Sequence, residues 1–391
     1  MKIVIAPQAF KGGLRGMEVA RAMEEGVRLV HPDAETVLVP VADGGDGTLD
    51  VLVEGPSVTA GGAIDRSGRQ GRGRYFQTRV TGPLGEPVTA AWGVMGGGRT
   101  AVVEMARASG LALMSEESRD PRITTTRGTG ELISAALDGG YREVIVGLGG
   151  SATNDGGAGM AQALGARLTD DRGADIPAGG AALAHLDRID LSGVDPRLKG
   201  CRILAATDVT NPLCGPEGAS FIYGPQKGAT PAVVEELDTT LKRYAEVVRR
   251  DVGVDILSLP RAGAAGGLGA GLVALLGAEL ASGGDIVCDA VDLNGHLEGA
   301  SLVLTGEGQL DGQTVYDKAP IVVARRAAAL GIPVIAVAGS LGEGYQAVLK
   351  QGITAVEAAT PVSMPLQEAL ARAHELVREA TERAVRASRI L

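Results

Sequence analysis

Near the middle of the chain, a loop rich in glycine and hydroxyl residues joins a short apolar segment to a helix-like one. The segment Val144–Val146 has the length and β-branching of a buried strand, the loop Gly149–Gly159 follows, and Met160 opens a stretch of helical composition. Backbone N–H groups and a helix N-terminus arranged in this way can bind an anion, although such a turn is more often only a turn. The loop also carries Asp155, which a bare phosphate site does not favour. Asp155 therefore indicates a divalent cation, a substrate hydroxyl or a tight turn.

The size and composition of the chain predict a two-domain globular protein. Its 391 residues are enough for two cores of common size, and hydrophobic residues at 45% with charged residues at 21% are typical of soluble proteins. The 59 glycines gather where strands are expected to end, which favours loops that approach a ligand. A net charge of −10 argues against a nucleic-acid binder.

The cysteines and the apolar runs indicate in which cellular compartment the protein is expected. The chain has three widely spaced cysteines, Cys201, Cys214 and Cys288, which indicate neither a disulfide framework nor a paired-cysteine metal site. The first apolar run is too short for a signal peptide, and glycines interrupt the uncharged run Ala262–Ala278, which is too short for a membrane span. We expect a cytoplasmic protein without a membrane partner.

Several further strands are expected to end in chemically active residues. The strand Lys2–Ala6 leads to Lys11, where a phosphate could rest on backbone amides beside a point charge. The residues alone slightly favour a solvated loop lysine, and the spacing is not that of a Walker A loop. Asp43 follows the strand Thr36–Val41 and could bind magnesium or a hydroxyl, or only form a turn. Asp208 follows another apolar strand, at the end where open α/β sheets present their chemistry.

Other segments predict local structure. Pro231–Asp251 has helical composition with a proline suited to its first turn, and Thr78–Gly93 is typical of two strands joined by a Pro/Gly turn. Arginines are frequent between Asp65 and Arg79, where we place a domain crossing, and they could bind an anionic substrate or form a solvated face. The glycines of Pro260–Gly271 could let a nucleotide approach the backbone, although no strand directly precedes them.

The order of these blocks carries a resemblance to a known family. Seven blocks contribute to it: Phe10–Gly12, Pro40–Gly45, Gly149–Gly159, Ala206–Pro216, Gly224–Ala229, Ala262–Gly269 and Thr305–Thr314. Over nearly its full length the chain closely resembles the bacterial glycerate kinase family of the glycerate 2-kinase type. The resemblance implies transfer of phosphate from ATP, with Mg²⁺, to D-glycerate, which would give 2-phosphoglycerate.

The resemblance also implies an α/β fold with two domains around an active-site cleft. A Rossmann-like domain with a parallel sheet would comprise residues 1–75 and 295–391, from both ends of the chain, and residues 76–294 would form a larger inserted α/β domain. The partners would be small molecules, glycerate and ATP, with no nucleic acid, and the protein would be a monomer or homodimer.

Some residues depart from the family pattern. Gln8, Ala9 and Gly13 replace a usual carboxylate and two hydroxyl residues beside Lys11. Gln309 replaces a usual arginine, and Asp317 replaces a usual glycine. These departures could change the catalytic efficiency, the metal coordination and the range of substrates that the resemblance implies. A kinase for another small hydroxy acid, or a ligand-binding regulatory protein with weakened turnover, are therefore the alternatives.

The strand ends and the resemblance together select the candidate site residues. The catalytic candidates are Lys11 and Asp208, and the metal candidates are Asp43 and Asp155. The candidates for cofactor binding are Gly12, Gly13, Gly266, Gly267, Gly306 and Glu307. The candidates for substrate binding are Asp43, Arg66, Arg74, Arg107, Ser151, Asn154, Asp155, Asn211 and Lys227.

Overall fold

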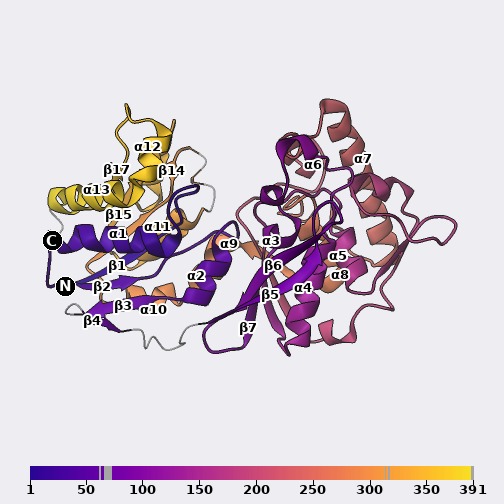
Figure 1. Ribbon diagram of the computed structural model, residues 1–391, viewed down its shortest axis with the longest axis horizontal. Helices are drawn as coiled ribbons and strands as arrows, with labels where there is room; N and C mark the ends of the chain where they lie inside the picture. Colours follow the sequence, from indigo (N-terminus) through magenta and orange to yellow (C-terminus); the bar gives the residue numbers. More distant parts are fainter. Residues whose placement is uncertain (61–62, 66–72, 313, 316–317, 389–391) are drawn as a thin grey trace. The chain divides into compact units, whose positions relative to one another are not determined.

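The chain forms a mixed α/β structure with two compact units (Figure 1). This computed structural model describes residues 1–60, 63–65, 73–312, 314–315 and 318–388, so the candidate Arg66 and the departure at Asp317 lie outside the described residues. Unit 1 comprises Met1–Asp43, Asp50–Gly73 and Gly283–Leu391, and unit 2 comprises Gly44–Leu49 and Arg74–Ser282. Within the described residues, no helix has the length and apolar character needed to cross a membrane.

Unit 1 is organised around a seven-stranded sheet that uses both ends of the chain. Its central strands are parallel because each is followed by a helical crossover, and their apolar residues are buried. Two antiparallel strands extend one edge. In spatial order the strands are β17 (Ala355–Ala358), β15 (Val334–Ala338), β13 (Leu302–Gly306), β1 (Lys2–Pro7), β2 (Glu35–Leu38), β3 (Ser57–Ala60) and β4 (Ala63–Asp65).

The helices of unit 1 cover both faces of this sheet. Helices α1 (Gly16–Arg28) and α13 (Ala373–Ala387) share one apolar core with alternate residues of β1, β13 and β15 and lie side by side (Figure 1). Helix α11 (Ala319–Ala329) packs against the same strands outside that core and contacts α9 (Gly283–Ala290) and α10 (Leu293–Leu297). The remaining elements are α2 (Thr48–Glu54), β14 (Gln309–Leu310), β16 (Ser340–Leu341) and α12 (Leu366–Ala371).

Unit 2 has a six-stranded sheet with a parallel part and an antiparallel edge. The parallel strands are β12 (Glu279–Ser282), β11 (Arg202–Thr207), β8 (Glu143–Gly147) and β7 (Thr100–Glu104). The antiparallel strands are β6 (Pro87–Val94) and β5 (Arg74–Thr81), which form the hairpin expected from the sequence. Main helices are α4 (Arg127–Asp138), α5 (Ala158–Ala163), α7 (Pro231–Asp251) and α8 (Leu268–Leu276), with α3 (Ala106–Ser109), α6 (Ala219–Tyr223) and the hairpin of β9 (Arg167–Thr169) and β10 (Arg188–Asp190) beside them.

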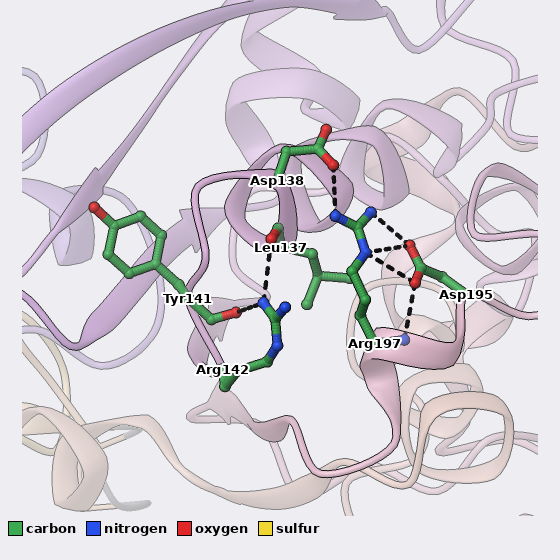
Figure 2. A network of polar contacts seen from close by, with 6 residues as sticks. All are labelled: Leu137, Asp138, Tyr141, Arg142, Asp195 and Arg197. Atoms are coloured by element: carbon green, nitrogen blue, oxygen red, sulfur yellow. Dashed lines mark hydrogen bonds and ion pairs between the residues drawn. The ribbon is translucent and has the colours of Figure 1, made fainter.

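Two arginines anchor the end of α4 to its surroundings (Figure 2). Arg142 donates from one nitrogen to the carbonyls of Leu137 and Tyr141, which satisfies carbonyl groups at the helix C-terminus. Arg197 bonds to both oxygens of Asp195 and also to Asp138, at 2.7 Å. These contacts lie where β8 begins, at the amino-terminal edge of the sheet, so their role is structural.

The points at which the chain changes unit differ somewhat from the expected domain limits. The crossings were expected after residues 75 and 294, whereas the units change after Gly73 and Ser282. Helices α9 and α10 belong to unit 1 because they pack against α11. The short segment Gly44–Leu49 belongs to unit 2, because the carbonyl of Gly44 accepts a bond from the amide of Gly149 at 3.0 Å.

The contact between α1 and α13 generates a prediction about Gly26. An added Cβ at Gly26 would lie 2.4 Å from the carbonyl oxygen of Arg378 and 2.8 Å from the Cβ of Thr381. Alanine in an open helix is more favourable than glycine by about 1 kcal/mol, but overpacking costs about 1–3 kcal/mol. The middle of that range less the gain gives an expected loss of about 1 kcal/mol in the free energy of unfolding of Gly26→Ala, measured by urea titration. The exposed control Arg21→Ala, in the same helix, should change it by less than about 0.5 kcal/mol; equal effects would show that the close contact is not the cause.

Candidate functional site

Three strands of unit 2 end in register at the carboxyl edge of its sheet. Glu104 pairs with Gly147, and Gly147 pairs with Ala206, so the loops after β7, β8 and β11 leave the sheet side by side. These loops carry Arg107, Ser151, Asp208 and Asn211, listed from β7 to β11. The edge is the place where open α/β sheets bind ligands.

Arg74 lies at the opposite, amino-terminal end of the parallel strands. The sequence had grouped it with the other substrate-binding candidates. It pairs with Val94, which pairs with Ala101, which in turn pairs with Val144 at the start of β8. Arg74 is exposed and its guanidinium lies 5.9 Å from the ring centre of Phe76. The register therefore separates Arg74 from the other substrate candidates of unit 2.

Asp155 is completely buried and holds the N-termini of two helices. Its Oδ2 accepts from the amide and hydroxyl of Thr126, at 2.8 and 2.9 Å, and from the amide of Gly159 at 3.3 Å. Its Oδ1 accepts from the amide of Gly157 at 3.1 Å. Burial raises the pKa of the Asp155 carboxyl, and these hydrogen bonds oppose that rise. Because its oxygens face α4 and α5, the geometry favours the tight-turn interpretation over a metal or substrate contact.

Asn154 and Lys227 support the same loop from inside the unit. Asn154 is fully buried and donates to the hydroxyl of Ser220 at 3.0 Å. The Nζ atom of Lys227 donates to the hydroxyl of Ser151 at 2.9 Å and to the carbonyl of Thr153 at 2.7 Å, and only 1% of the residue is exposed. Burial lowers the pKa of Lys227 to about 7, and the charge of Asp155 opposes the shift. Both side chains are thus less exposed than Ser151, of which 7% is exposed, and they bond to groups inside the unit.

Asp208 is partly exposed, and its charge acts on Tyr223, a residue that the sequence did not single out and that bonds to the candidate Asn211. The hydroxyl of Tyr223 donates to Asn211 at 2.6 Å, and Asn211 donates to the carbonyl of Glu217 at 2.7 Å. Burial and the charge of Asp208 raise the pKa of Tyr223 to about 12, which places the phenol near that carboxylate. The position of Tyr223 one residue before the Gly224–Ala229 block was the available sequence signal.

Arg261 was also missed, because its role depends on backbone conformation. Its φ of 67° is in the left-handed region, which is unusual for a residue with a side chain. Its guanidinium donates to the carbonyls of Thr207 and Val209, at 3.3 and 3.4 Å, on either side of Asp208. Arg261 therefore restrains the backbone that carries the candidate base.

Arg107 is oriented by a buried glutamate. Its Nε donates to Glu104 at 2.7 Å, and the other oxygen of Glu104 accepts from the amide of Leu49 at 2.7 Å. About 40% of the Arg107 side chain is exposed, compared with 3% for Glu104. Arg107 thus combines a fixed position with access to solvent, as an anion-binding residue requires.

Gly266 and Gly267 have a packing role in the structure. An added Cβ at Gly266 would lie 2.0 Å from the carbonyl oxygen of Thr153, and one at Gly267 would lie 2.9 Å from the side chain of Leu213 and 3.0 Å from Gly156. Both glycines are buried and have positive φ values. They allow two backbone segments of unit 2 to approach, and this packing leaves no room for the nucleotide contact expected from the sequence.

A second polar group lies in unit 1, after β1, β2 and β13. Gln8 donates to Asp43 at 2.7 Å, and Lys318 lies 3.3 Å from Glu307, whose other oxygen accepts from Thr314 at 2.8 Å. Burial raises the pKa of Glu307, Lys318 lowers it, and the charge of Asp43 raises it further. Asp43 and Glu307 are therefore close enough to interact. Lys318 was not among the sequence-based candidates, although it lies just after the Thr305–Thr314 block.

The glycines near this group differ in exposure. Lys11, Gly12 and Gly13 are exposed, and Gly12 has a φ of 78° with open space around its Cα. An added Cβ at Gly306 would lie 1.8 Å from the carbonyl oxygen of Val337, so Gly306 serves the close approach of β13 and β15. The loop of Lys11 therefore remains the accessible part of the expected nucleotide site.

The described residues contain no group of three or more His, Cys, Asp or Glu residues placed to hold a metal ion. Magnesium often takes one or two carboxylates and completes its shell with water and phosphate oxygens. Asp43 and Glu307 supply such carboxylates, and the buried Oε1 of Gln8 has no hydrogen-bond partner among the described residues. This set of oxygen donors fits a hard cation.

The saturation of Asp155 generates a prediction about stability. In Asp155→Asn, an amide group replaces one acceptor and faces N–H donors, which leaves buried groups unsatisfied. We expect a loss of about 3 kcal/mol in the free energy of unfolding, measured in urea. Asp170 provides a matched control, because its Oδ1 also accepts two backbone amides, those of Arg172 and Ala174, in an exposed turn. Asp170→Asn should cost less than about 1 kcal/mol, and a mild effect at both positions would contradict the structural role of Asp155.

Comparisons with known proteins identify the family. The model of the Glycerate kinase family matches residues 3–389. Glycerate 2-kinase of Escherichia coli (strain K12) is 51% identical over 96% of this chain and 94% of its own length, and glycerate kinase of Bacillus subtilis (strain 168) is 48% identical over 99% and 97%. A crystal structure from Salmonella typhimurium LT2 that carries the name glycerate kinase 2 has a TM-score of 0.85 and 49% identity, over 99% of this chain and 97% of that one. The chain belongs to the glycerate kinase family and is a kinase.

Proposed function

We propose that this enzyme transfers the terminal phosphoryl group of ATP to the 2-hydroxyl of D-glycerate and releases 2-phosphoglycerate and ADP. The observation that carries the proposal is the position of Asp208, a partly exposed carboxylate at the carboxyl end of β11, in a chain 51% identical to a glycerate 2-kinase. The name of that relative supports the choice of glycerate and of its 2-hydroxyl.

Asp208 is the proposed base. It would accept the proton of the substrate hydroxyl while that oxygen bonds to the γ-phosphorus and the bond from phosphorus to the β–γ bridging oxygen breaks. Arg261 restrains the backbone on both sides of Asp208. The charge of Asp208 acts on Tyr223, which donates to Asn211. Such positioning and charge compensation are the main contributions that a protein makes to phosphoryl transfer.

Charge complementarity selects the remaining roles. Arg107 is the proposed partner of the glycerate carboxylate, because its guanidinium is accessible and oriented by Glu104. Lys11 is the proposed partner of the phosphate oxygens, together with the backbone of Gly12 and Gly13. Asp43 and Glu307 would hold Mg²⁺, and the bound ion would compensate negative charge on the phosphates.

The departures in the Gln8–Gly13 loop favour one alternative, a kinase for another small hydroxy acid. Gln8 donates to Asp43, so an amide stands where the family usually has a carboxylate, and the local negative charge is lower. This difference lies in unit 1, with the proposed magnesium ligands. Membership of an enzyme family disfavours the regulatory-protein alternative.

A substrate panel tests the proposal. Purified enzyme with magnesium and ATP is assayed for ADP release with D-glycerate, L-glycerate, D-lactate, tartronate and glycerol, and ³¹P NMR identifies the product. We expect D-glycerate to have the highest kcat/KM and the phosphate to be on its 2-oxygen. A higher kcat/KM with another hydroxy acid would show that D-glycerate is not the preferred substrate. Phosphate on the 3-oxygen would contradict the proposed transfer to the 2-hydroxyl.

The role of Asp208 gives a kinetic prediction. General-base catalysis contributes typically 10²–10⁴-fold, so we expect Asp208→Asn to lower kcat by at least about 100-fold and to remove the acidic limb of its pH profile. The matched control is Asp171→Asn on an exposed turn, which should leave kcat unchanged. Near-normal kcat with an unchanged pH profile in Asp208→Asn would exclude this residue as the base.

A further inference from the structure

Among the described residues, no carboxylate is hydrogen-bonded to the buried Nζ atom of Lys227. Its two hydrogen-bond acceptors are the hydroxyl of Ser151 and the carbonyl of Thr153, and Asp155 acts on it only through its charge. Removing an ammonium group from water is expensive unless its hydrogen bonds compensate. A methionine of similar shape would fill the same space without this desolvation cost. A lysine at this buried position therefore indicates that its N–H groups have a specific role.

The bond between Lys227 and Ser151 fixes the direction in which the hydroxyl can donate. In its charged form Lys227 has three donors and no acceptor, so the oxygen of Ser151 accepts from Nζ in that form. The hydroxyl hydrogen of Ser151 is then directed away from Nζ, and no other described residue is hydrogen-bonded to this hydroxyl. Lys227 therefore leaves Ser151 with a hydrogen-bond donor that is available to a ligand.

Ser151 occupies a suitable place for such a ligand. It follows β8 at the carboxyl edge of the unit 2 sheet and forms a backbone bridge with Gly110, which directly follows the short helix α3 that carries Arg107. An added Cβ on the preceding Gly150 would lie 3.1 Å from the Cβ of Ala106, the residue before Arg107. The hydroxyl donor and the accessible guanidinium are thus carried by adjoining loops.

We propose that Lys227 is a positioning residue that makes Ser151 a hydrogen-bond donor to the carboxylate of the hydroxy-acid substrate. This inference rests on the proposed function and deepens it. It replaces the direct substrate contact expected for Lys227 with an action through Ser151. A carboxylate only accepts hydrogen bonds, so a hydroxyl held in the donating direction is better prepared for it than a freely rotating one.

A double-mutant cycle tests the inference. KM and kcat are measured for wild type, Ser151→Ala, Lys227→Met and the double variant, with the hydroxy acid that the wild type phosphorylates best. We expect each single substitution to raise KM about 10-fold, the equivalent of about 1.4 kcal/mol, with kcat changed less, and the double variant to be no worse than either. Additive increases, or an unchanged KM in Lys227→Met, would overturn the inference.

A matched control separates positioning from general support of the loop. Thr124 is fully buried and donates to the carbonyl of Ala152 at 2.9 Å, beside Ser151. Thr124→Val removes one buried donor to the same loop without touching the Ser151 hydroxyl, so its Tm should fall while KM stays unchanged. A rise in KM equal to that of Lys227→Met would assign Lys227 a merely structural role and overturn the inference.

Two further measurements keep the test decisive. If Lys227→Met does not fold, Lys227→Gln carries the same prediction, because its amide can accept from Ser151 as well as donate to it. Ser151→Thr retains a hydroxyl and should keep the low KM only while Lys227 is present. Absence of turnover with every hydroxy acid of the panel overturns the proposed function itself, whereas turnover with additive effects overturns only the role of Lys227.

Discussion

The arrangement of unit 2 depends on one buried carboxylate. Asp155 accepts hydrogen bonds from Thr126, Gly157 and Gly159, and thereby compensates the unpaired N–H groups at the start of α4 and α5. Its geometry determines where the loop after β8 leaves the sheet. The ring of Tyr244 leaves no space for a side chain at Gly156, so helix α7 also depends on this turn. The accessible groups of the site are placed on this framework.

The buried carboxylates of the two units, Asp155 and Glu307, have different hydrogen-bond partners. In unit 2, neutral donors surround Asp155, and Lys227, on which its charge acts, is directed to Ser151 and Thr153. In unit 1, Glu307 bonds to Thr314 and to the cation Lys318, and it interacts with Asp43. A carboxylate saturated by backbone amides serves the fold. A carboxylate beside another carboxylate and an unpaired amide oxygen has the chemistry of a cation site.

The agreement between sequence and structure is best where local periodicity decides. Helix α7 covers the residues expected, Pro231–Asp251, and the hairpin of β5 and β6 has the Pro/Gly turn. Long amphipathic periodicity and turn chemistry require no knowledge of distant neighbours. The glycine-rich blocks were harder to interpret, because open space at Gly12 and a carbonyl 2.0 Å from an added Cβ at Gly266 look alike in a sequence.

The sequence by itself determined the α/β class, the parallel strands, the family and the set of polar residues that follow the strands. Only the tertiary structure decided which of these residues are exposed and which are buried. Asp155, Asn154 and Lys227 are buried, whereas Asp208 and Arg107 are partly exposed. Arg74 lies at the opposite end of the strands. The physical reason is that exposure and hydrogen-bond partners depend on segments distant in the chain. Asp155 accepts from Thr126, and Asn154 donates to Ser220, both distant in the chain. The residues next to Asp155 and Asn154 in the sequence are equally compatible with a binding loop.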